Sequence, residues 1–299
     1  MVWNSGWELA SAVSNAGGLG LIGAGSMHPD TLRLHIQKCK KATQKPFGVN
    51  VPLLYPQLDE IVKIIIEEGV KIVFTSAGSP KKWTPVFKEA GIIVVHVIAN
   101  SLLAIKCDEA GVDAIVAEGF EAGGHNGREE TTTLTLIPAT RRVTKTPLIA
   151  AGGITTGRQM LAAVALGAEG VQMGSRFAAS IESSGHQAFK DEILKAKEGA
   201  TSLALKGLVP VRLIKNKFWD EIKSLEDAGA DAQTLKDKLG KGRAKLGMFE
   251  GNLDEGELEI GQGAALIDNI LSAQEIIAEV MLEFKLAKSE LGRTDYYHR

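Results

Sequence analysis

Seven short apolar runs rich in β-branched residues, separated by amphipathic helical segments, constrain the fold of this chain more than any other feature. The runs start near Leu19, Phe47, Lys71, Ile92, Asp113, Leu148 and Glu169. Runs such as residues 92–95 are apolar throughout, as expected for strands that are buried on both faces. Regular alternation of strands and helices predicts βα units around a parallel sheet.

The ends of these elements indicate which edge of the sheet carries function. The helical segments stop repeatedly at a glycine just before the next strand: Gly17, Gly69, Gly91, Gly111 and Gly167. Glycine adopts the left-handed conformation that ends a helix. The carboxyl ends of the strands instead carry polar or small residues, and a (β/α)8 barrel builds its active site at that face. The sequence therefore predicts an α/β fold, a (β/α)8 TIM barrel.

A closed barrel needs eight strands, and the chain supplies seven. Because residues 6–16 are predicted to form the first helix, the first strand is expected upstream of Met1, which leaves an unpaired edge and an open wall. We divide the chain into a cofactor-binding barrel at 1–198, a charged helical insertion or cap at 199–260, and C-terminal helices at 261–299 that pack back on the barrel. Within the insertion, the charge runs at 236–245 and 254–259 are predicted to be solvated faces.

Composition excludes several classes of function. With 34 basic and 36 acidic residues, the chain has no electrostatic footprint for nucleic acid. Cys39 and Cys107 lie far apart and form no CxxC pair, so neither a disulfide framework nor a metal site is expected. The amino terminus lacks the pattern of a signal peptide, and the most apolar window, residues 91–105, is too short and polar to span a bilayer. We expect a cytoplasmic protein without a membrane partner.

Residues 118–127, Glu-Gly-Phe-Glu-Ala-Gly-Gly-His-Asn-Gly, follow a predicted buried strand and carry the main candidate for chemistry. Glycines permit close approach of the backbone to a ligand, and the ordinary pKa of a histidine such as His125 suits proton transfer near neutrality. Taken alone, the stretch also fits a plain loop with a surface histidine. His96, at the end of another strand, is interpreted as a hydrogen-bonded core residue.

Two glycine turns end the last two strands, Ala-Ala-Gly-Gly-Ile at 150–154 and Gln-Met-Gly-Ser-Arg at 172–176. The loops after strands 7 and 8 of such barrels often bind phosphate through backbone N–H groups. A phosphorylated cofactor is therefore predicted there. The glycines at 17–25 do not fit a dinucleotide fingerprint, because they end a helix and run through a strand instead of opening a helix.

Together these motifs resemble the nitronate monooxygenase (2-nitropropane dioxygenase) family of FMN-dependent (β/α)8 enzymes, which includes the flavin-dependent enoyl-acyl-carrier-protein reductase II. The resemblance covers essentially the whole barrel and rests on residues 12–20, 48–50, 121–125, 150–154 and 172–177. The family's first strand and its Gly-Gly before the methionine are missing.

The resemblance assigns roles by position. It implies that Asn50 holds the flavin ring, that Glu118 and Gly123 touch it, and that His125 is the catalytic base. It also implies an FMN phosphate site made of Gly152, Gly153, Gly174 and Ser175, with Gln172 and Met173 nearby.

Three functions follow from the resemblance. The sequence favours a nitronate monooxygenase, in which FMN passes the substrate's electrons to dioxygen and His125 takes the proton from the carbon beside nitrogen. The alternative is an enoyl-acyl-carrier-protein reductase that uses NAD(P)H, acts on an enoyl thioester and has acyl carrier protein as a partner. Glu118 stands at a position where many nitronate monooxygenases have glutamine and the reductases have glutamate. Residues 75–80 and 211–216 also resemble the reductase branch. A flavin-binding barrel without turnover is the third; a homodimer is compatible with each.

Overall fold

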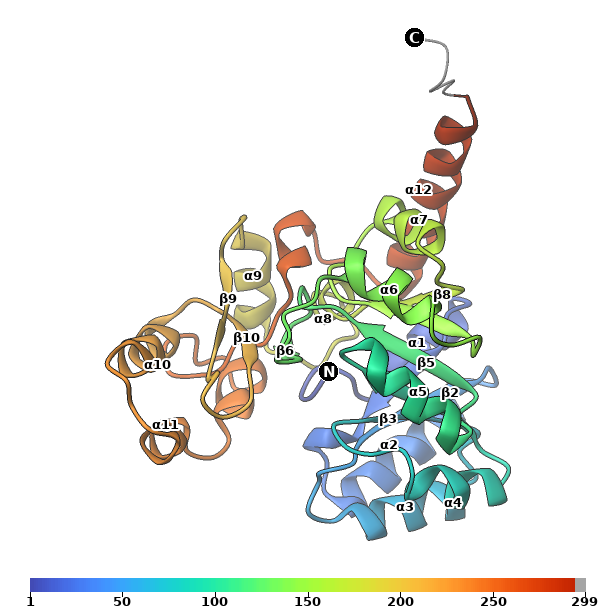
Figure 1. The fold of residues 1–299 in the computed structure, drawn as a ribbon, viewed down its shortest axis with the longest axis horizontal. Helices are drawn as coiled ribbons and strands as arrows, with labels where there is room; N and C mark the ends of the chain where they lie inside the picture. Colours follow the sequence, from blue (N-terminus) through green and yellow to red (C-terminus); the bar gives the residue numbers. More distant parts are fainter. Residues whose placement is uncertain (294–299) are drawn as a thin grey trace.

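A parallel sheet of seven strands forms the centre of the computed structural model, which describes residues 1–293 (Figure 1). Each strand pairs in parallel with the next one along the sheet. All seven predicted runs form strands of this sheet, which confirms the βα architecture. The strands, in sheet order, are β1 (Gly20–Gly23), β2 (Phe47–Pro52), β3 (Ile72–Ser76), β4 (Ile93–Ile98), β5 (Ala114–Glu118), β7 (Leu148–Ala151) and β8 (Gly170–Gln172).

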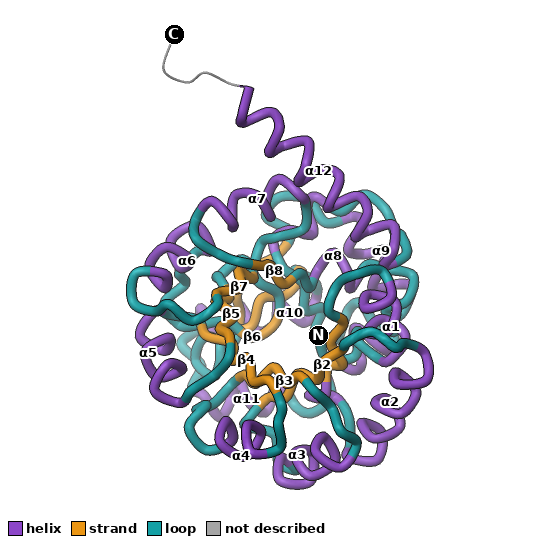
Figure 2. Tube along the Cα trace, turned by 90° about the vertical axis from the view of Figure 1, so that its right-hand side faces the viewer, coloured by secondary structure: helices purple, strands orange, loops and turns teal. Residues whose placement is uncertain are grey.

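Helices surround the strands, as the view along the sheet axis shows (Figure 2). Alternate strand residues face the two sides: Val73 belongs to the core that also contains helix residues such as Ile36, whereas Phe74 packs with Val95 and Val116 in a separate core cluster. Both faces are therefore apolar. The helices are α1 (Trp7–Asn15), α2 (Pro29–Ala42), α3 (Leu58–Glu67), α4 (Trp83–Glu89), α5 (Ser101–Ala110), α6 (Thr133–Arg141) and α7 (Gly157–Ala165), with a short turn, η1 (Ala24–Ser26), after β1.

The five glycines predicted to end helices all adopt the expected conformation. Their φ angles are +95° at Gly17, +65° at Gly69, +70° at Gly91, +73° at Gly111 and +109° at Gly167. Residues other than glycine rarely adopt these φ angles. The glycines therefore fix the point at which each helix turns into its next strand.

The sheet stays open between its two edge strands, β1 and β8, within the described residues. Residues 1–5 run along β1, where the Ser5 carbonyl accepts the Gly23 N–H at 3.0 Å. A Cβ atom on Gly174 would lie 3.9 Å from the Met1 side chain, so Met1 reaches the loop that follows β8. Figure 2 shows the amino terminus beside the ring of strands.

Residues 199–260 differ from the helical insertion that the sequence predicted. Their first part forms an antiparallel pair, β9 (Thr201–Ala204) and β10 (Val211–Ile214), and β10 also pairs with β6 (Gly124–His125). The helical, charged pattern begins only with α10 (Lys217–Asp227) and α11 (Ala232–Leu239), whereas 211–214 is a mainly apolar run that favours a strand. We call residues 199–260 the lobe; it lies on the left of Figure 1.

The remaining elements connect the lobe to the barrel. They are α8 (Ser175–Ala178), α9 (Gln187–Lys195), the π-helical turn η2 (Lys245–Phe249), η3 (Gln262–Leu266) and α12 (Ala273–Arg293). Helix α12 packs against the start of α7, where the Gly157 N–H donates to Glu283 Oε2 at 2.6 Å. None of the helices within residues 1–293 combines the length and apolarity that crossing a membrane requires.

Candidate functional site

His125 lies on a different sheet from the strand that precedes it. Strand β5 ends at Glu118, the chain turns through 119–123, and His125 then pairs with Val211 of β10. Its side chain is exposed. The candidate base is therefore held between the barrel and the lobe, an arrangement that the local sequence did not reveal.

Arg212 fixes the turn between Glu118 and His125. It is 1% exposed, and its Nε and Nη2 donate to the Phe120 carbonyl at 3.1 and 3.0 Å. Its guanidinium lies 4.4 Å from the centre of the Phe120 ring, a cation–π contact. Burial lowers the pKa of Arg212. The motifs named residues 211–216 only as a resemblance and gave Arg212 no role, although an arginine within an apolar strand was a usable signal.

The backbone of residues 260–261 passes so close to Gly123 that a side chain at this position would not fit. A Cβ on Gly123 would lie 2.4 Å from the Ile260 carbonyl carbon, and one on Gly261 would lie 2.7 Å from the Glu121 carbonyl oxygen. The Gly261 N–H donates to Ser175 Oγ at 3.0 Å. The segment 259–263 therefore passes between the turn after β5 and the loop after β8.

Gly152 and Gly153 lie at the turn after β7, with φ angles of +93° and +70°. A Cβ on Gly152 would lie 2.6 Å from the Gly119 carbonyl oxygen, so this position has no room for a side chain. Both glycines border a cavity of about 280 Å³, whose other lining residues include Glu121, Thr133, Gln159, Gln262 and Gly263. The predicted phosphate turn thus faces a cavity of mixed lining, which also includes apolar side chains such as Leu134, Leu166 and Leu266.

Two residues that the resemblance places at the cofactor, Gln172 near the phosphate and Asn50 at the ring, fit a flavin. Gln172 Oε1 is buried and has no hydrogen-bond partner within the described part of the chain, so it can accept from a ligand N–H. Next to Met173, Gly174 has no atom within 3.9 Å of the site of a Cβ except Met1. Asn50 Nδ2 donates to the Phe74 carbonyl at 3.1 Å, which fixes the amide at the end of β2. A flavin would supply a hydrogen-bond donor for Gln172 Oε1.

Three carboxyl groups, those of Glu118, Glu257 and Glu259, are linked electrostatically through the Met1 amine and one another, and the last two contradict the prediction of a solvated run at 254–259. Burial raises the pKa of Glu118 to about 7, against the opposing effect of the Met1 amine. Glu257 is 8% exposed, and burial raises the pKa of Glu259. The run 254–259 is therefore not a solvated face throughout. Its signal was the alternation of Glu257 and Glu259 with the buried Leu258 and Ile260, which is typical of an extended segment.

The raised pKa of Glu257 predicts how the free energy of unfolding depends on pH. Burial and the neighbouring Glu259 raise its pKa from 4.5 to about 8. Between these values the folded state binds more protons than the unfolded state, so the free energy of unfolding falls as the pH rises. We expect Glu257→Gln to flatten this decline, measured by urea denaturation at several pH values. Glu255→Gln is the control, because a hydrogen bond from Lys217 lowers the pKa of Glu255 and its loss gives no gain at alkaline pH.

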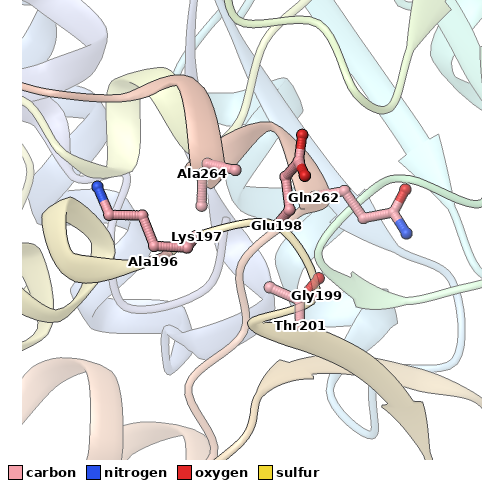
Figure 3. Close-up of a pocket in the computed structure, with 8 residues that line it drawn as sticks. Ala196, Lys197, Glu198, Gly199, Thr201, Gln262 and Ala264 are labelled. Atoms are coloured by element: carbon pink, nitrogen blue, oxygen red, sulfur yellow. The ribbon is translucent and has the colours of Figure 1, made fainter.

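A second cavity lies apart from the predicted residues. It measures about 260 Å³ and lies between the connection from α9 to β9 and η3. Figure 3 shows Lys197 and Gln262 extending in opposite directions from it. Lys197 and Glu198 line it, but none of the residues predicted for the site does.

The other histidine considered, His96, is a core residue as the sequence predicted. It is 3% exposed, and its Nδ1 lies 2.7 Å from Thr75 Oγ1. Burial lowers its pKa to about 4, so it stays neutral at ordinary pH.

Comparison with known proteins places this geometry among flavin enzymes. The family model for nitronate monooxygenase matches residues 1–283. The structure of FabK from Thermotoga maritima superposes with a TM-score of 0.93 at 43% identity, covering 98% of this chain and 93% of that one. A probable nitronate monooxygenase of Staphylococcus saprophyticus is 31% identical, over 92% of this chain and 90% of its own. A (3aS,4S,5R,7aS)-5-hydroxy-7a-methyl-1-oxo-octahydro-1H-indene-4-carboxyl-CoA dehydrogenase of Mycobacterium tuberculosis is also 31% identical, over 95% and 90%.

Proposed function

Because the chain belongs to the nitronate monooxygenase family of oxidoreductases, we propose that it is an FMN-dependent reductase of enoyl thioesters. The observation that carries this proposal is the 43% identity with FabK, an enoyl-acyl-carrier-protein reductase II, over 98% of the chain. The relative named as a nitronate monooxygenase is 31% identical. We therefore put enoyl-thioester reduction first, whereas the sequence motifs alone favoured nitronate oxidation.

Two further observations support a thioester substrate. The mycobacterial relative is named for a CoA thioester. Glu118 is an acid at the position where, by the family resemblance, many nitronate monooxygenases carry glutamine. Its raised pKa of about 7 lets it hold a proton close to the predicted flavin ring near neutrality.

The reaction divides its tasks among residues of the barrel and of the lobe. NAD(P)H and one proton are consumed, the carbon–carbon π bond breaks, and C–H bonds form at the α- and β-carbons. FMN, when bound, supplies the two-electron carrier between nicotinamide and substrate. Asn50 and Gln172 orient the ring, and the turns at 152–153 and 174–175 hold the phosphate. His125 holds the proton that the α-carbon receives.

The exposed position of His125 suits this role. Since its side chain reaches solvent, the ring can regain a proton from water between turnovers. A site that opens beside the lobe can also admit an acyl group carried by a large partner, and we propose acyl carrier protein as that partner.

Nitronate oxidation is the second candidate. It is favoured by the family model and by the staphylococcal relative. In that reaction His125 would take the proton from the carbon next to nitrogen when the substrate is a neutral nitroalkane, and dioxygen would accept the electrons.

Anaerobic flavin reduction separates the candidates. For the reductase, NAD(P)H bleaches the visible flavin absorbance of the FMN-loaded protein, and crotonyl-CoA then restores the colour. Bleaching by a nitronate without nicotinamide identifies the oxidation instead. A protein that takes up added FMN but responds to neither reagent is a flavin-binding barrel without turnover, and both proposals then fail.

A further inference from the structure

Glu121 joins the turn after β5 to the first residue of α6. Its carboxylate accepts the Thr133 N–H, at 3.1 Å on Oε1 and 2.9 Å on Oε2, and its Oε2 lies 3.1 Å from Thr133 Oγ1. A negative group is favourable at the start of a helix, where backbone N–H groups lack partners. Glu121 is half-buried and Thr133 is buried, so the carboxylate fixes the place of the threonine.

Thr133 in turn contacts the glycine turn after β7. Its Oγ1 lies 2.8 Å from the Gly152 carbonyl oxygen and 3.2 Å from the Ala151 carbonyl oxygen. Because a hydroxyl has a single proton to donate, the shortest of its contacts indicates that the proton goes to Gly152. Glu121 then holds Thr133 through the N–H, while the hydroxyl of Thr133 holds the turn.

The bond to Gly152 also sets the direction of the next N–H group. The Gly152 carbonyl and the Gly153 N–H belong to one planar trans peptide, in which the two groups point in opposite directions. Holding the carbonyl toward Thr133 therefore aims the N–H away from α6. Within residues 1–293 the Gly153 N–H donates to no other group. It is an available donor in the turn proposed to hold the cofactor phosphate.

Close packing keeps Glu121 and this turn together. A Cβ on Gly153 would lie 3.0 Å from the Cβ of Glu121. On its other side, the main-chain carbonyl of Glu121 accepts the Gln262 N–H at 2.9 Å. Burial lowers the pKa of Arg212, and the charge of Glu121 opposes this effect, so the two charges partly balance each other.

We propose that Glu121 is a positioning residue for the cofactor phosphate, which sets the orientation of the Gly152–Gly153 peptide through Thr133. The inference rests on the FMN site of the proposed function. It concerns affinity for the phosphate group and involves no chemical step, so it can be tested without turnover.

Flavin binding with and without the phosphate isolates this effect. FMN and riboflavin differ only in that group, and quenching of flavin fluorescence by the flavin-free chain gives Kd for each. Thr133→Val keeps the N–H and removes the hydroxyl. We expect its Kd for FMN to rise roughly tenfold, about the contribution of one hydrogen bond, while its Kd for riboflavin stays the same. Thr133→Ser restores the hydroxyl and should bind FMN like the wild type.

An equal loss of affinity for both flavins in Thr133→Val, or no loss for FMN, overturns the proposal. The control is Thr135→Val, the same substitution at an exposed threonine two residues further along α6. It should leave both Kd values unchanged.

Glu121→Ala tests the carboxylate itself. Its Kd for FMN should rise by a similar factor, and the double variant with Thr133→Val should show no further rise, since both changes break the same chain of bonds. Tighter binding of FMN in Glu121→Ala would mean that the carboxylate repels the phosphate. Additive losses would mean that the two residues act separately, and either result contradicts the proposal.

The wild type separates this inference from the proposed function. FMN should bind more tightly than riboflavin, and equal affinities would overturn both the phosphate turn and the role of Glu121. If FMN is preferred and Thr133→Val keeps that preference, the phosphate turn stands and the role of Glu121 fails. If Thr133→Val loses the preference but the wild type reduces no enoyl thioester, the role of Glu121 stands and the proposed reductase fails.

Discussion

Replacing His125 with alanine should leave the flavin spectrum unchanged and lower kcat by roughly 10²- to 10⁴-fold, the usual contribution of a positioned acid or base. The imidazole lies on β6, outside the turns at 152–153 and 174–175 that are predicted to hold the cofactor phosphate. Its loss therefore removes the proposed proton donor and leaves the proposed cofactor turns intact. Steady-state kinetics with crotonyl-CoA, combined with flavin absorbance of the purified variant, measures both quantities.

The control is His28→Ala, which removes an exposed histidine at the start of α2. This variant should retain the wild-type kcat. Turnover that survives in His125→Ala would refute the proton-transfer role, and loss of the bound flavin would show instead that His125 supports the cofactor.

Arg212→Ala should lower the free energy of unfolding by roughly 3 kcal/mol, within the range seen when a buried hydrogen-bonded charge is removed. The change leaves the Phe120 carbonyl without its two donors and removes the group that stacks on the Phe120 ring. Because the turn 119–123 is then no longer anchored to β10, flavin binding should weaken as well. Urea denaturation and titration with FMN measure the two effects.

Arg128→Ala is the matched control for this prediction. Arg128 also links the segment after β6 to the lobe, through the Leu208 carbonyl at 2.6 Å, but its side chain is exposed. Its loss should cost less than about 1 kcal/mol. Equal destabilisation by the two variants would show that burial of Arg212 adds nothing to the free energy of unfolding.

The sequence predicted the elements whose signals are local. A β-branched run predicts a buried strand, and a glycine such as Gly111 predicts the end of a helix, independently of the rest of the chain. The seven strands and five helix ends were therefore predictable. The polar residues at the carboxyl ends of the strands are also a local signal, and they indicate the face at which we propose the site.

Contacts between distant segments could not be predicted. The bond from Arg212 to Phe120 joins residues 92 positions apart, and β6 becomes a strand only because β10 arrives beside it. The charged neighbours of Glu259 in sequence predict a solvated side chain. In the structure, its surroundings include β6 and the amino terminus, which are far away in sequence. Gly123 is a further example. A glycine in the sequence indicates that another group lies close to the backbone, but it does not identify that group as the backbone of residues 260–261.

The small sheet β6–β10–β9 attaches the proposed proton donor to the lobe, whereas Asn50, Gly152 and Gly153 belong to the barrel. The proposed proton donor therefore depends on the lobe for its position, whereas the turns proposed to hold the cofactor belong to the barrel. Substitutions in α10 or α11 can move His125 relative to a bound substrate without touching the cofactor turns. The lobe is therefore the part of the chain to exchange when a new acceptor is wanted.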